Sequence, residues 1–428
     1  MSIAIPKGTY DILPVEPDVN FSWRQSRFWN YLETTICTLA KSYGFQEVRT
    51  PLFERTELFQ RGVGDSSDIV SKEMYTFEDK AGRSMSLRPE MTASVMRAFI
   101  EKQLHLQSPL HKLFYIGPMF RYDRPQAGRY RQFHQFGAEA IGNGSEEQDV
   151  EIIDLLYSLY ESLGLKNLTL HINSVGDSNC RGAFRQALQD FLTPVAAKLS
   201  PDSQIRLKTN PLRILDSKDP ADHALLEEAP SLKNYLNDEC KSNLEKICNL
   251  LTQLNIPFNV NAKLVRGLDY YNKTVFEITS GELGAQNTIG AGGRYDGLIK
   301  TLGGPNLPAV GFATGIERIL QTLIAQNAYL PVRQGPTLFI IALGASANTY
   351  CFTLLKQLRQ NGIFAEMDFS DKKLKDKLRY ADSLKAKYSL VIGENELLCD
   401  KAELKEMQTH TTETVTLSCL IQKLKSLP

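Results

Sequence analysis

The sequence has no excess of charge of either sign and no long apolar run. Its 49 basic and 49 acidic residues leave a formal net charge of zero, which removes any attraction of the whole molecule to nucleic acid, so RNA binding has to depend on local patches. No apolar stretch reaches the roughly 18 residues that a membrane-spanning helix needs. The first residues, MSIAIPKGTYDILP, lack the apolar core of a secretion signal. These absences predict no membrane association.

Paired cysteines are also missing. The seven cysteines are scattered, odd in number and free of any Cys-x-x-Cys pair, so their pattern indicates neither a disulfide framework nor a zinc ribbon. No second histidine stands at metal-ligand spacing from His134. We therefore expect a cytoplasmic protein without a protein-bound metal.

The common phosphate-binding loops are missing as well. Gly290, Gly292, Gly293 and Gly297 form a glycine cluster, but it has neither the Walker spacing with a lysine nor the Gly-x-Gly-x-x-Gly register of a dinucleotide fold. A tight turn or a close approach of two backbones explains these glycines. The cluster therefore favours none of the common phosphate-loop enzymes.

The length and composition predict several ordinary folded domains. With 428 residues the chain exceeds the size at which one hydrophobic core stops growing, and its 42% hydrophobic and 23% charged residues are typical of globular proteins. Apolar residues at every third or fourth position predict helices over 21–43, ended by Gly44, and over about 147–163. After the first helix, FQEVRTPLFE predicts an edge strand or an interface, because Pro51 cannot donate to a sheet ladder.

The remaining periodicity predicts a sheet interrupted by helices. Two apolar stretches within 110–142, separated by a polar loop, predict an antiparallel hairpin. Further predicted elements are strands over 168–172, 258–265 and 274–279, a mainly helical segment over 174–252, and a helix from about Gly315. Beyond a linker at 331–336, TLFIIAL, FAEMDF and YSLVIG predict a small α/β domain with parallel strands and right-handed crossovers.

The loop of the predicted hairpin carries a dense positive charge. Arg121, Arg124, Arg129 and Arg131 lie within eleven residues that contain a single acid, Asp123. Because the guanidinium fork is always ionised and matches phosphate oxygens, such a loop suits a phosphate-binding site. A solvated basic loop explains the same residues equally well.

Other polar clusters have structural and functional interpretations. Glu90 and Thr92 suit the capped start of a helix. Arg266 and Asp269, next to Tyr270 and Tyr271, suit a turn beside core aromatics, although an acid, an arginine and two phenols also suit a small zwitterion with an aromatic ring. His134 fits a base, a ligand or an alternating strand residue, and the lysines and arginine of 372–379 fit a solvated helix face better than an RNA contact.

Together these segments resemble the histidyl-tRNA synthetases, a family of class II aminoacyl-tRNA synthetases, over essentially the whole chain. The Pro51 region resembles the first class motif at the dimer interface, 120–142 the second and VGFATGIER the third. LVRGLDYY and GAGGRYDG resemble the two histidine-specific signatures, and RGVGDSSDIVSKEMYTFED resembles the stretch before the family's RPE segment.

The resemblance implies an α+β fold. Its parts are an antiparallel β-sheet of six or more strands flanked by helices, a helical insertion, and a C-terminal α/β anticodon-binding domain. On this plan 1–173 and 253–330 form the catalytic domain, 174–252 the insertion and 337–428 the anticodon-binding domain. The family also implies a homodimer.

The resemblance further implies a cytoplasmic histidine–tRNA ligase. Such an enzyme activates L-histidine with ATP to histidyl-adenylate and pyrophosphate, and then transfers histidine to the 3′ end of histidine tRNA. Mg²⁺ accompanies ATP as part of the substrate complex, held largely by phosphates and water. Selectivity for histidine follows because buried groups that hydrogen-bond the imidazole would be left without partners by an amino acid of the same shape that lacks the ring nitrogens.

The resemblance also assigns residue roles. Arg121 holds the α-phosphate of ATP, Phe133 stacks on adenine, Arg318 clamps the γ-phosphate, and Asp123 stands where the class usually has Glu to meet the adenine amino group. Glu90 and Thr92 receive the ammonium of histidine, while Gln135, Glu139, Tyr270 and Tyr271 surround the substrate. Arg266 is the catalytic residue between the substrate carboxylate and the α-phosphate, where it stabilises developing charge together with Arg121.

Two rival functions fit part of this pattern. The synthetase-like regulatory subunit of ATP phosphoribosyltransferase would bind histidine without activating it, but we expect it to lack Arg266, the two tyrosines and a separate C-terminal domain. A class II synthetase for glycine, proline or threonine shares the general motifs but not the residues for imidazole. Met91 stands where many relatives have glycine, so its side chain has to point away from the ammonium site or restrict it.

Overall fold

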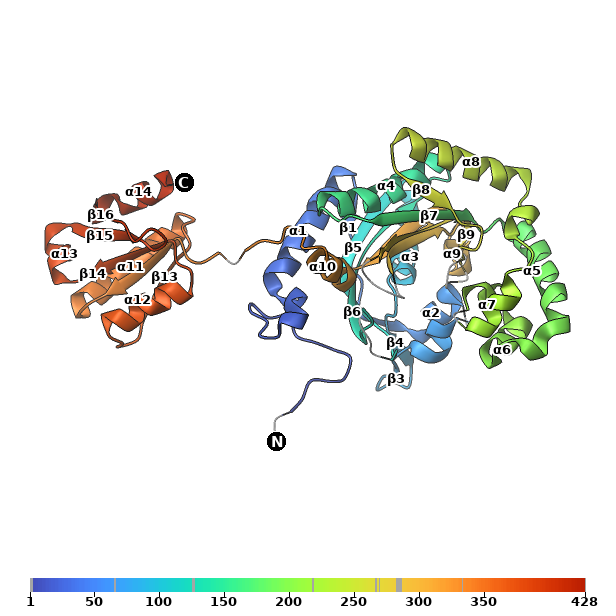
Figure 1. Cartoon of the computed structure of the whole chain (residues 1–428), viewed down its shortest axis with the longest axis horizontal. Coiled ribbons are helices and arrows are strands. Elements are labelled where there is room, and N and C mark those ends of the chain that lie inside the picture. The colour runs from blue at the N-terminus through green and yellow to red at the C-terminus, as the bar shows by residue number, and fades with distance from the viewer. Residues whose placement is uncertain are drawn as a thin grey trace. The chain divides into compact units, whose positions relative to one another are not determined.

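The computed structural model describes residues 3–64, 67–124, 128–217, 219–265, 268, 270–281, 287–332 and 334–427. The chain divides into two compact units, Met1–Leu330 and Pro331–Pro428 (Figure 1). Among the described residues, no helix is long and apolar enough to cross a membrane.

An eight-stranded sheet forms the centre of the first unit. Its strands run in the order β1 (Gln46–Glu47), β5 (His111–Phe120), β6 (Gln132–Ile141), β11 (Ala309–Gly315), β10 (Thr288–Arg294), β9 (Asn272–Ser280), β7 (Leu168–Ser174) and β8 (Phe258–Val260). The six strands from β5 to β7 pair antiparallel, whereas β1 and β8 add to the two edges in parallel. The predicted antiparallel sheet of six or more strands is confirmed.

The β5–β6 hairpin predicted from the sequence is regular along its whole length. Its ten residue pairs run from His111 opposite Ile141 to Phe120 opposite Gln132. Alternation along β5 sends Phe114 into the core on one face and Tyr115 into the core on the other. A Cβ on Gly137 would lie 2.3 Å from the Tyr115 ring, so glycine lets this tyrosine lie across the neighbouring strand.

The glycine cluster lies in a strand. Gly290, Gly292 and Gly293 belong to β10, so a tight turn is the wrong interpretation for these three. A Cβ on Gly292 would stand 2.2 Å from the carbonyl oxygen of Gly311 on β11. The close approach of two backbones is therefore confirmed, and side chains are excluded between β10 and β11 at this point.

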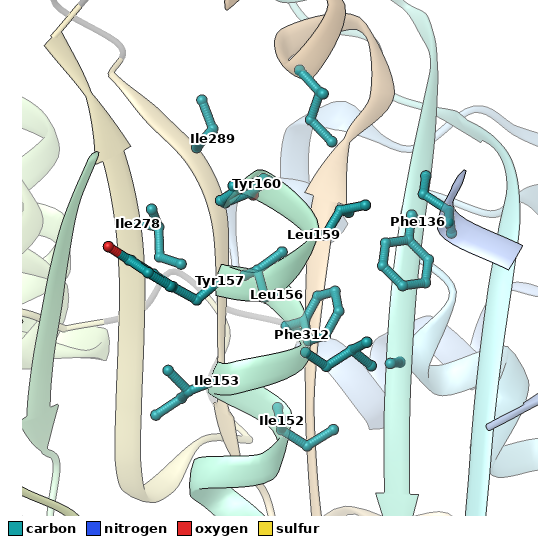
Figure 2. Close-up of a cluster of buried hydrophobic side chains, with 14 of the residues drawn as sticks. Phe136, Ile152, Ile153, Leu156, Tyr157, Leu159, Tyr160, Ile278, Ile289 and Phe312 are labelled. Atoms are coloured by element: carbon teal, nitrogen blue, oxygen red, sulfur yellow. The ribbon is translucent and has the colours of Figure 1, made fainter. Parts of the chain in front are cut away.

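Helices cover one face of the sheet. They include α1 (Ser26–Ser42), α4 (Glu146–Ser162) and α10 (Ile316–Ala325), whose apolar residues share one buried cluster with the strands. Figure 2 shows α4 lying along the strands, where Leu156 and Tyr160 belong to the same buried cluster as Ile278, Ile289 and Phe312. The predicted positions of these three helices are confirmed, except that α1 begins at Ser26 because 19–24 form a 3-10 turn.

The opposite face carries α3 (Thr92–Glu101) and a second buried cluster. Met91, Val95 and Phe99 pack there against Tyr115 and Tyr295. Nearby, α2 (Thr56–Val63), the one-turn π-helix η2 (Ile69–Glu73) and a small sheet in the order β2 (Phe53–Arg55), β4 (Ser84–Leu87), β3 (Thr76–Glu78) complete the N-terminal half. The predicted edge strand after α1 is therefore two strands, β1 and β2, in different sheets.

The chain between β7 and β8 is helical. It forms α5 (Ser178–Leu192), η4 (Thr193–Lys198), α6 (Pro201–Thr209), η5 (Pro211–Asp216), α7 (Pro220–Leu226), η6 (Leu232–Tyr235) and α8 (Asp238–Gln253). Most of these helices pack around Phe184, Leu188 and Ile214, whereas Ile247 and Leu251 of α8 belong to the core cluster of the central sheet. The helical character predicted for 174–252 is confirmed, while its status as a separate domain stays a prediction.

The second unit is a five-stranded sheet with helices. The strand order is β13 (Ala365–Met367), β12 (Leu338–Ala342), β14 (Tyr388–Ile392), β15 (Lys401–Glu406) and β16 (Thr412–Thr416). The helices are α11 (Ala345–Gln360), α12 (Leu374–Ser383), α13 (Glu394–Cys399) and α14 (Leu420–Ser426). The three predicted parallel strands are confirmed. The solvated face predicted for 372–379 holds except at Lys377, which is buried.

Candidate active site

A cavity of about 630 Å³ opens beside the α3 face of the central sheet. All ten described residues that were predicted for the site line it: Glu90, Thr92, Arg121, Asp123, Phe133, Gln135, Glu139, Tyr270, Tyr271 and Arg318. They come from α3, the β5–β6 hairpin, the segment before β9, and α10. Arg266 lies outside the described residues.

The most deeply buried acid of the cavity is Glu139 on β6, which is 1% exposed. The hydroxyl of Thr92 donates to its Oε1 at 2.7 Å, the hydroxyl of Tyr295 donates to its Oε2, and the hydroxyl of Tyr115 lies 3.5 Å from Oε1. Burial raises the pKa of Glu139 to about 8, although these hydroxyl groups oppose the rise. The carboxyl group therefore exchanges its proton near neutral pH.

Gly311 makes room for this carboxyl group. It faces Glu139 across the β11–β6 pairing, and a Cβ built on it would stand 1.8 Å from Glu139 Oε2. Any side chain at this position would displace the carboxyl group.

Glu90 combines the two roles considered for it, a helix cap and a cavity acid. Its carboxylate accepts the backbone N–H groups of Thr92 at 2.8 Å and Ala93 at 3.0 Å at the start of α3, which confirms the predicted cap. It is also buried at the cavity wall, and burial raises its pKa against the effect of these hydrogen bonds and of nearby Arg121. A cation bound beside it would offset that cost.

Gln135, on the same strand as Glu139, has an unsatisfied oxygen. Its Oε1 is buried and has no hydrogen-bond partner among the described residues. Because a buried carbonyl oxygen without a donor is costly, a ligand that brings an N–H group would stabilise this part of the cavity.

Two arginines hold the other end of the cavity. Arg121 Nε donates to the carbonyl of Pro89 at 2.9 Å, and its guanidinium lies 5.2 Å from the centre of the Phe133 ring. Arg318 Nε donates to the carbonyl of Gly128 at 3.2 Å. Burial lowers the pKa of both, and in Arg318 the positive charges of Arg129 and Arg121 lower it further. Such mutual repulsion favours a polyanionic ligand.

The hairpin loop supplies partners for arginines that the sequence left without a role. Arg129 forms an ion pair with Asp123 at 2.7 Å, and the guanidinium of Arg131 lies 4.1 Å from the centre of the Tyr122 ring. Asp123 also accepts the backbone N–H of Arg124 at 2.7 Å. Asp123 is therefore held in place by its own loop at the edge of the cavity.

Aromatic rings form one wall of the cavity. The ring centres of Tyr270 and Tyr271 are 4.7 Å apart, and those of Tyr270 and Tyr295 are 5.4 Å apart. Burial raises the pKa of the Tyr270 and Tyr295 hydroxyl groups well above its ordinary value. Both phenols therefore keep their protons at neutral pH.

Among the lining residues that were not predicted from the sequence are Tyr295, Tyr115 and Glu73. Tyr295 lies within the GAGGRYDG segment, so its place in that signature was the one available signal. Tyr115 looks like any apolar residue of an alternating strand. Glu73 comes from η2, and burial raises its pKa while Arg121 lowers it.

Two other residues fall outside the cavity. The backbone N–H of His134 donates to Glu317 Oε1 at 2.7 Å, its Nδ1 lies 3.1 Å from the same oxygen, and its ring contacts the edge of Trp29. These contacts support the interpretation of His134 as a strand residue. Met91 is buried with Val95 and Phe99, away from the cavity lining.

An antiparallel sheet whose cavity contains a hairpin arginine, a second arginine at the start of α10 and a buried acid is the arrangement of a class II aminoacyl-tRNA synthetase. A family model described as histidyl-tRNA synthetase matches residues 21–319, and one described as anticodon binding domain matches 337–427. The chain belongs to the histidyl-tRNA synthetase family.

Similar proteins agree along the full length. The histidine–tRNA ligase of Protochlamydia amoebophila (strain UWE25) is 58% identical and covers 100% of both chains; that of Bacillus subtilis (strain 168) is 46% identical over 100% of this chain and 99% of its own. The apo histidyl-tRNA synthetase of S. aureus has a TM-score of 0.84 at 40% identity, covering 99% of this chain and 100% of its own.

These comparisons decide between the rival functions. The chain is an ATP-dependent histidine–tRNA ligase of translation. A Bacillus halodurans structure described as an ATP phosphoribosyltransferase regulatory subunit/histidyl-tRNA synthetase has a TM-score of 0.65, but at 21% identity it shares the fold alone. The regulatory role and the synthetases for other amino acids are therefore set aside.

Proposed function

We propose that the cavity binds L-histidine at its Glu139 end and ATP, accompanied by Mg²⁺, at its arginine end. One observation carries this proposal: a single cavity joins a buried carboxyl group surrounded by hydroxyls to a group of mutually repelling arginines. The first environment suits an imidazole and the second a triphosphate.

The histidine end has donors or acceptors for the ammonium group and the imidazole of the substrate. Glu90 and Thr92 receive the ammonium group, whose charge offsets the burial of the Glu90 carboxylate. Gln135 Oε1 accepts an N–H from the substrate, which satisfies its buried oxygen. Glu139 and Tyr271 bond the imidazole nitrogens, with Tyr270 beside them.

The nucleotide end combines stacking and charge. Phe133 stacks on adenine with the guanidinium of Arg121 close to its ring. Arg121 meets the α-phosphate and Arg318 the γ-phosphate. Asp123 accepts a hydrogen bond from the adenine amino group, and its ion pair with Arg129 holds it in position for this contact. Magnesium is held largely by phosphates and water.

Adenylate formation then needs positioning and charge stabilisation more than proton transfer. The substrate carboxylate oxygen attacks the α-phosphorus and pyrophosphate leaves. Arg121 and Arg266 stabilise the negative charge that develops on the α-phosphate during this step. Arg266 takes this role from the family resemblance.

The wider setting is also proposed from the family. The enzyme acts as a homodimer in the cytoplasm, on histidine tRNA that its C-terminal domain helps to bind. None of the seven cysteines forms a disulfide, which suits a reducing compartment. Leu52, Phe53 and Phe77 form an exposed apolar patch on the small sheet, which suits a subunit interface.

Pyrophosphate exchange with single-residue variants tests these roles. Gln135→Ala should raise KM for histidine about tenfold with KM for ATP almost unchanged, because one buried hydrogen bond is lost. Arg318→Ala should raise KM for ATP and leave KM for histidine almost unchanged. Gln253→Ala, at the exposed end of α8, serves as the control. Equal effects of either variant on both KM values would overturn the division of the cavity.

Arg266→His tests the catalytic role separately. It should cripple adenylate formation while histidine affinity changes little, because the lost interaction belongs to the transition state. A large loss of histidine affinity with normal turnover would refute that role.

A further inference from the structure

The N-termini of two helices between β7 and β8, α5 and α8, lie close together in space. Cys180 is the third residue of α5 and Cys240 the third residue of α8. Both are buried, at 3% and 1% exposure. Their sulfur atoms and a carboxylate oxygen of Asp177 all lie within 4.8 Å of one another. Cysteine spacing in the sequence contains no sign of this cluster, because the two residues are far apart along the chain.

The two helix caps hold the cluster together. Asp177 caps α5 by accepting the backbone N–H groups of Asn179 and Cys180, both at 2.9 Å, and Asn237 caps α8 by accepting that of Cys240 at 2.9 Å. The amide of Asn237 donates to the second oxygen of Asp177 at 2.8 Å. The caps therefore fix the carboxylate and both thiols relative to one another.

The groups around the two sulfur atoms act on their charge in opposite directions. The backbone N–H of Asn237 donates to Cys180 Sγ at 3.2 Å. Both thiols also lie in the first turn of a helix, near the positive end of its dipole. Burial, together with the neighbouring thiol and carboxylate, nevertheless raises the pKa of Cys240 to about 11. A pair of thiolates next to a carboxylate would need a cation to balance its charge.

We propose that Asp177, Cys180 and Cys240 bind one divalent cation of the zinc type, with water as the fourth ligand. Two thiolates with one carboxylate suit Zn²⁺ rather than Mg²⁺ or Ca²⁺, which prefer oxygen. Zinc–sulfur bonds of about 2.3 Å and zinc–oxygen bonds of about 2.0–2.2 Å place tetrahedral ligand atoms roughly 3.5–3.8 Å apart. The three ligand atoms now lie within 4.8 Å of one another, so side-chain rotations that bring them together by about 1 Å would complete the site.

Neither simpler explanation uses the whole cluster. As core residues the cysteines contact Phe184 and Leu236 in one apolar cluster, but such packing does not require a carboxylate beside the sulfurs. A disulfide would likewise not involve Asp177, which would serve only as a helix cap. The cation uses all three side chains.

A bound cation would tie the two ends of the helical segment. α5 is its first α-helix and α8 its last. Arg181, next to Cys180, donates to the carbonyl of Tyr271 at 2.8 Å, and Val175 bonds the carbonyl of Lys273 at 2.7 Å. The cation therefore stabilises the junction between this segment and the wall of the active-site cavity.

Titration of the full-length chain with Co²⁺ under reducing conditions tests the site. Co²⁺ stands in for Zn²⁺ and gives a sulfur-to-cobalt charge-transfer band in the near ultraviolet. We expect the band to saturate at one Co²⁺ per chain and to disappear on addition of Zn²⁺. Zn²⁺ should also raise the midpoint of thermal unfolding, because it binds the folded chain in preference to the unfolded one.

Variants identify the ligands. Cys180→Ser and Cys240→Ser should each weaken the band, and the double variant should abolish it. Asp177→Asn keeps a capping oxygen but loses the charge, so it should lower metal affinity at least roughly tenfold. Cys248→Ser, on the same helix α8 and only half-buried, should change nothing. Circular dichroism without metal checks the fold, and Cys→Ala replaces any serine variant that fails it.

Three results would overturn the proposal. The first is the absence of a stoichiometric charge-transfer band in the reduced chain. The second is a band that persists in the double variant. The third is a thiol titration of the denatured, unreduced chain that finds two thiols fewer than the sequence contains, with no such deficit in Cys240→Ala. That result would mean that Cys180 and Cys240 form a disulfide.

Discussion

The hydroxyl group of Tyr10 donates a hydrogen bond to the carboxylate of Glu317, the residue that precedes Arg318 at the start of α10. The same carboxylate oxygen accepts the backbone N–H of His134 on β6. Glu317 therefore joins the N-terminal segment, the returning strand of the hairpin and the helix of the distal arginine. These contacts position Phe133 and Arg318 on either side of the proposed nucleotide site.

Replacing Tyr10 should weaken ATP binding more than histidine binding. Tyr10→Phe removes one donor from a buried carboxylate, at a cost of about 1–3 kcal/mol. We expect KM for ATP in pyrophosphate exchange to rise roughly three- to tenfold, with KM for histidine unchanged. Tyr329→Phe, which alters an exposed phenol, is the control. A selective rise in KM for histidine would contradict the positioning role.

Glu139 should make the stability of the free enzyme depend on pH. Burial raises its pKa from 4.5 to about 8, so the folded chain keeps a proton that the unfolded chain has already lost. The unfolding free energy should therefore fall as pH rises from about 4.5 to about 8, by a few kcal/mol at most from this group. Glu139→Gln mimics the protonated acid, so it should flatten the fall.

Denaturant unfolding at several pH values in that window, without substrates, measures this difference. Glu101→Gln is the matched control, since Glu101 is an exposed acid whose pKa is lowered by Lys102 and Arg97. It should leave the fall between pH 4.5 and pH 8 in place. If Glu139→Gln and the parent chain lose stability in parallel across the window, Glu139 is ionised in the folded state and the assignment fails.

The sequence predicted those elements whose periodicity reports a buried face. The hairpin, α4 and the parallel strands of the second unit follow from alternation or from a repeat of three to four residues. β15 and β16, with the sequences KAELKE and TETVT, were missed because most of their side chains are polar. Polar strands such as these pair with neighbours that a local sequence pattern does not contain.

The site was predictable only in part for a related reason. The resemblance identified ten residues that line one cavity, but residue patterns alone left each of them with a structural explanation. The bonds from Tyr295 and Thr92 to Glu139 depend on three distant segments meeting at one point. Such convergence is a property of the packed fold, as is the meeting of Cys180 and Cys240.

Adding one methyl group at Gly311 should impair histidine binding. The Cβ of alanine would collide with Glu139 Oε2 at 1.8 Å and with the carbonyl of Ala138 at 2.5 Å. Gly311→Ala should therefore lower stability by about 1–3 kcal/mol and raise KM for histidine more than KM for ATP.

Gly182→Ala is the matched control for that substitution. Gly182 lies within α5, and a Cβ there would have no atom within 4 Å. Alanine should raise stability by roughly 0.5–1 kcal/mol through helix propensity, with exchange kinetics unchanged. If Gly311→Ala binds histidine as well as Gly182→Ala does, the carboxyl group of Glu139 does not need its present position.

The exposed apolar patch on the small sheet should hold two chains together. Phe53 and Phe77 meet edge to face with ring centres 6.3 Å apart, and Leu52, the residue before Phe53, is also exposed. Phe53→Asp places a charge in the proposed interface, so sedimentation velocity should show the loss of a species of two chains at micromolar concentration. Leu254→Asp is the control, because Leu254 and Phe53 are both 51% exposed. A parent chain that sediments as a single copy, or a Phe53→Asp chain that still sediments as two, would remove this patch from the subunit interface.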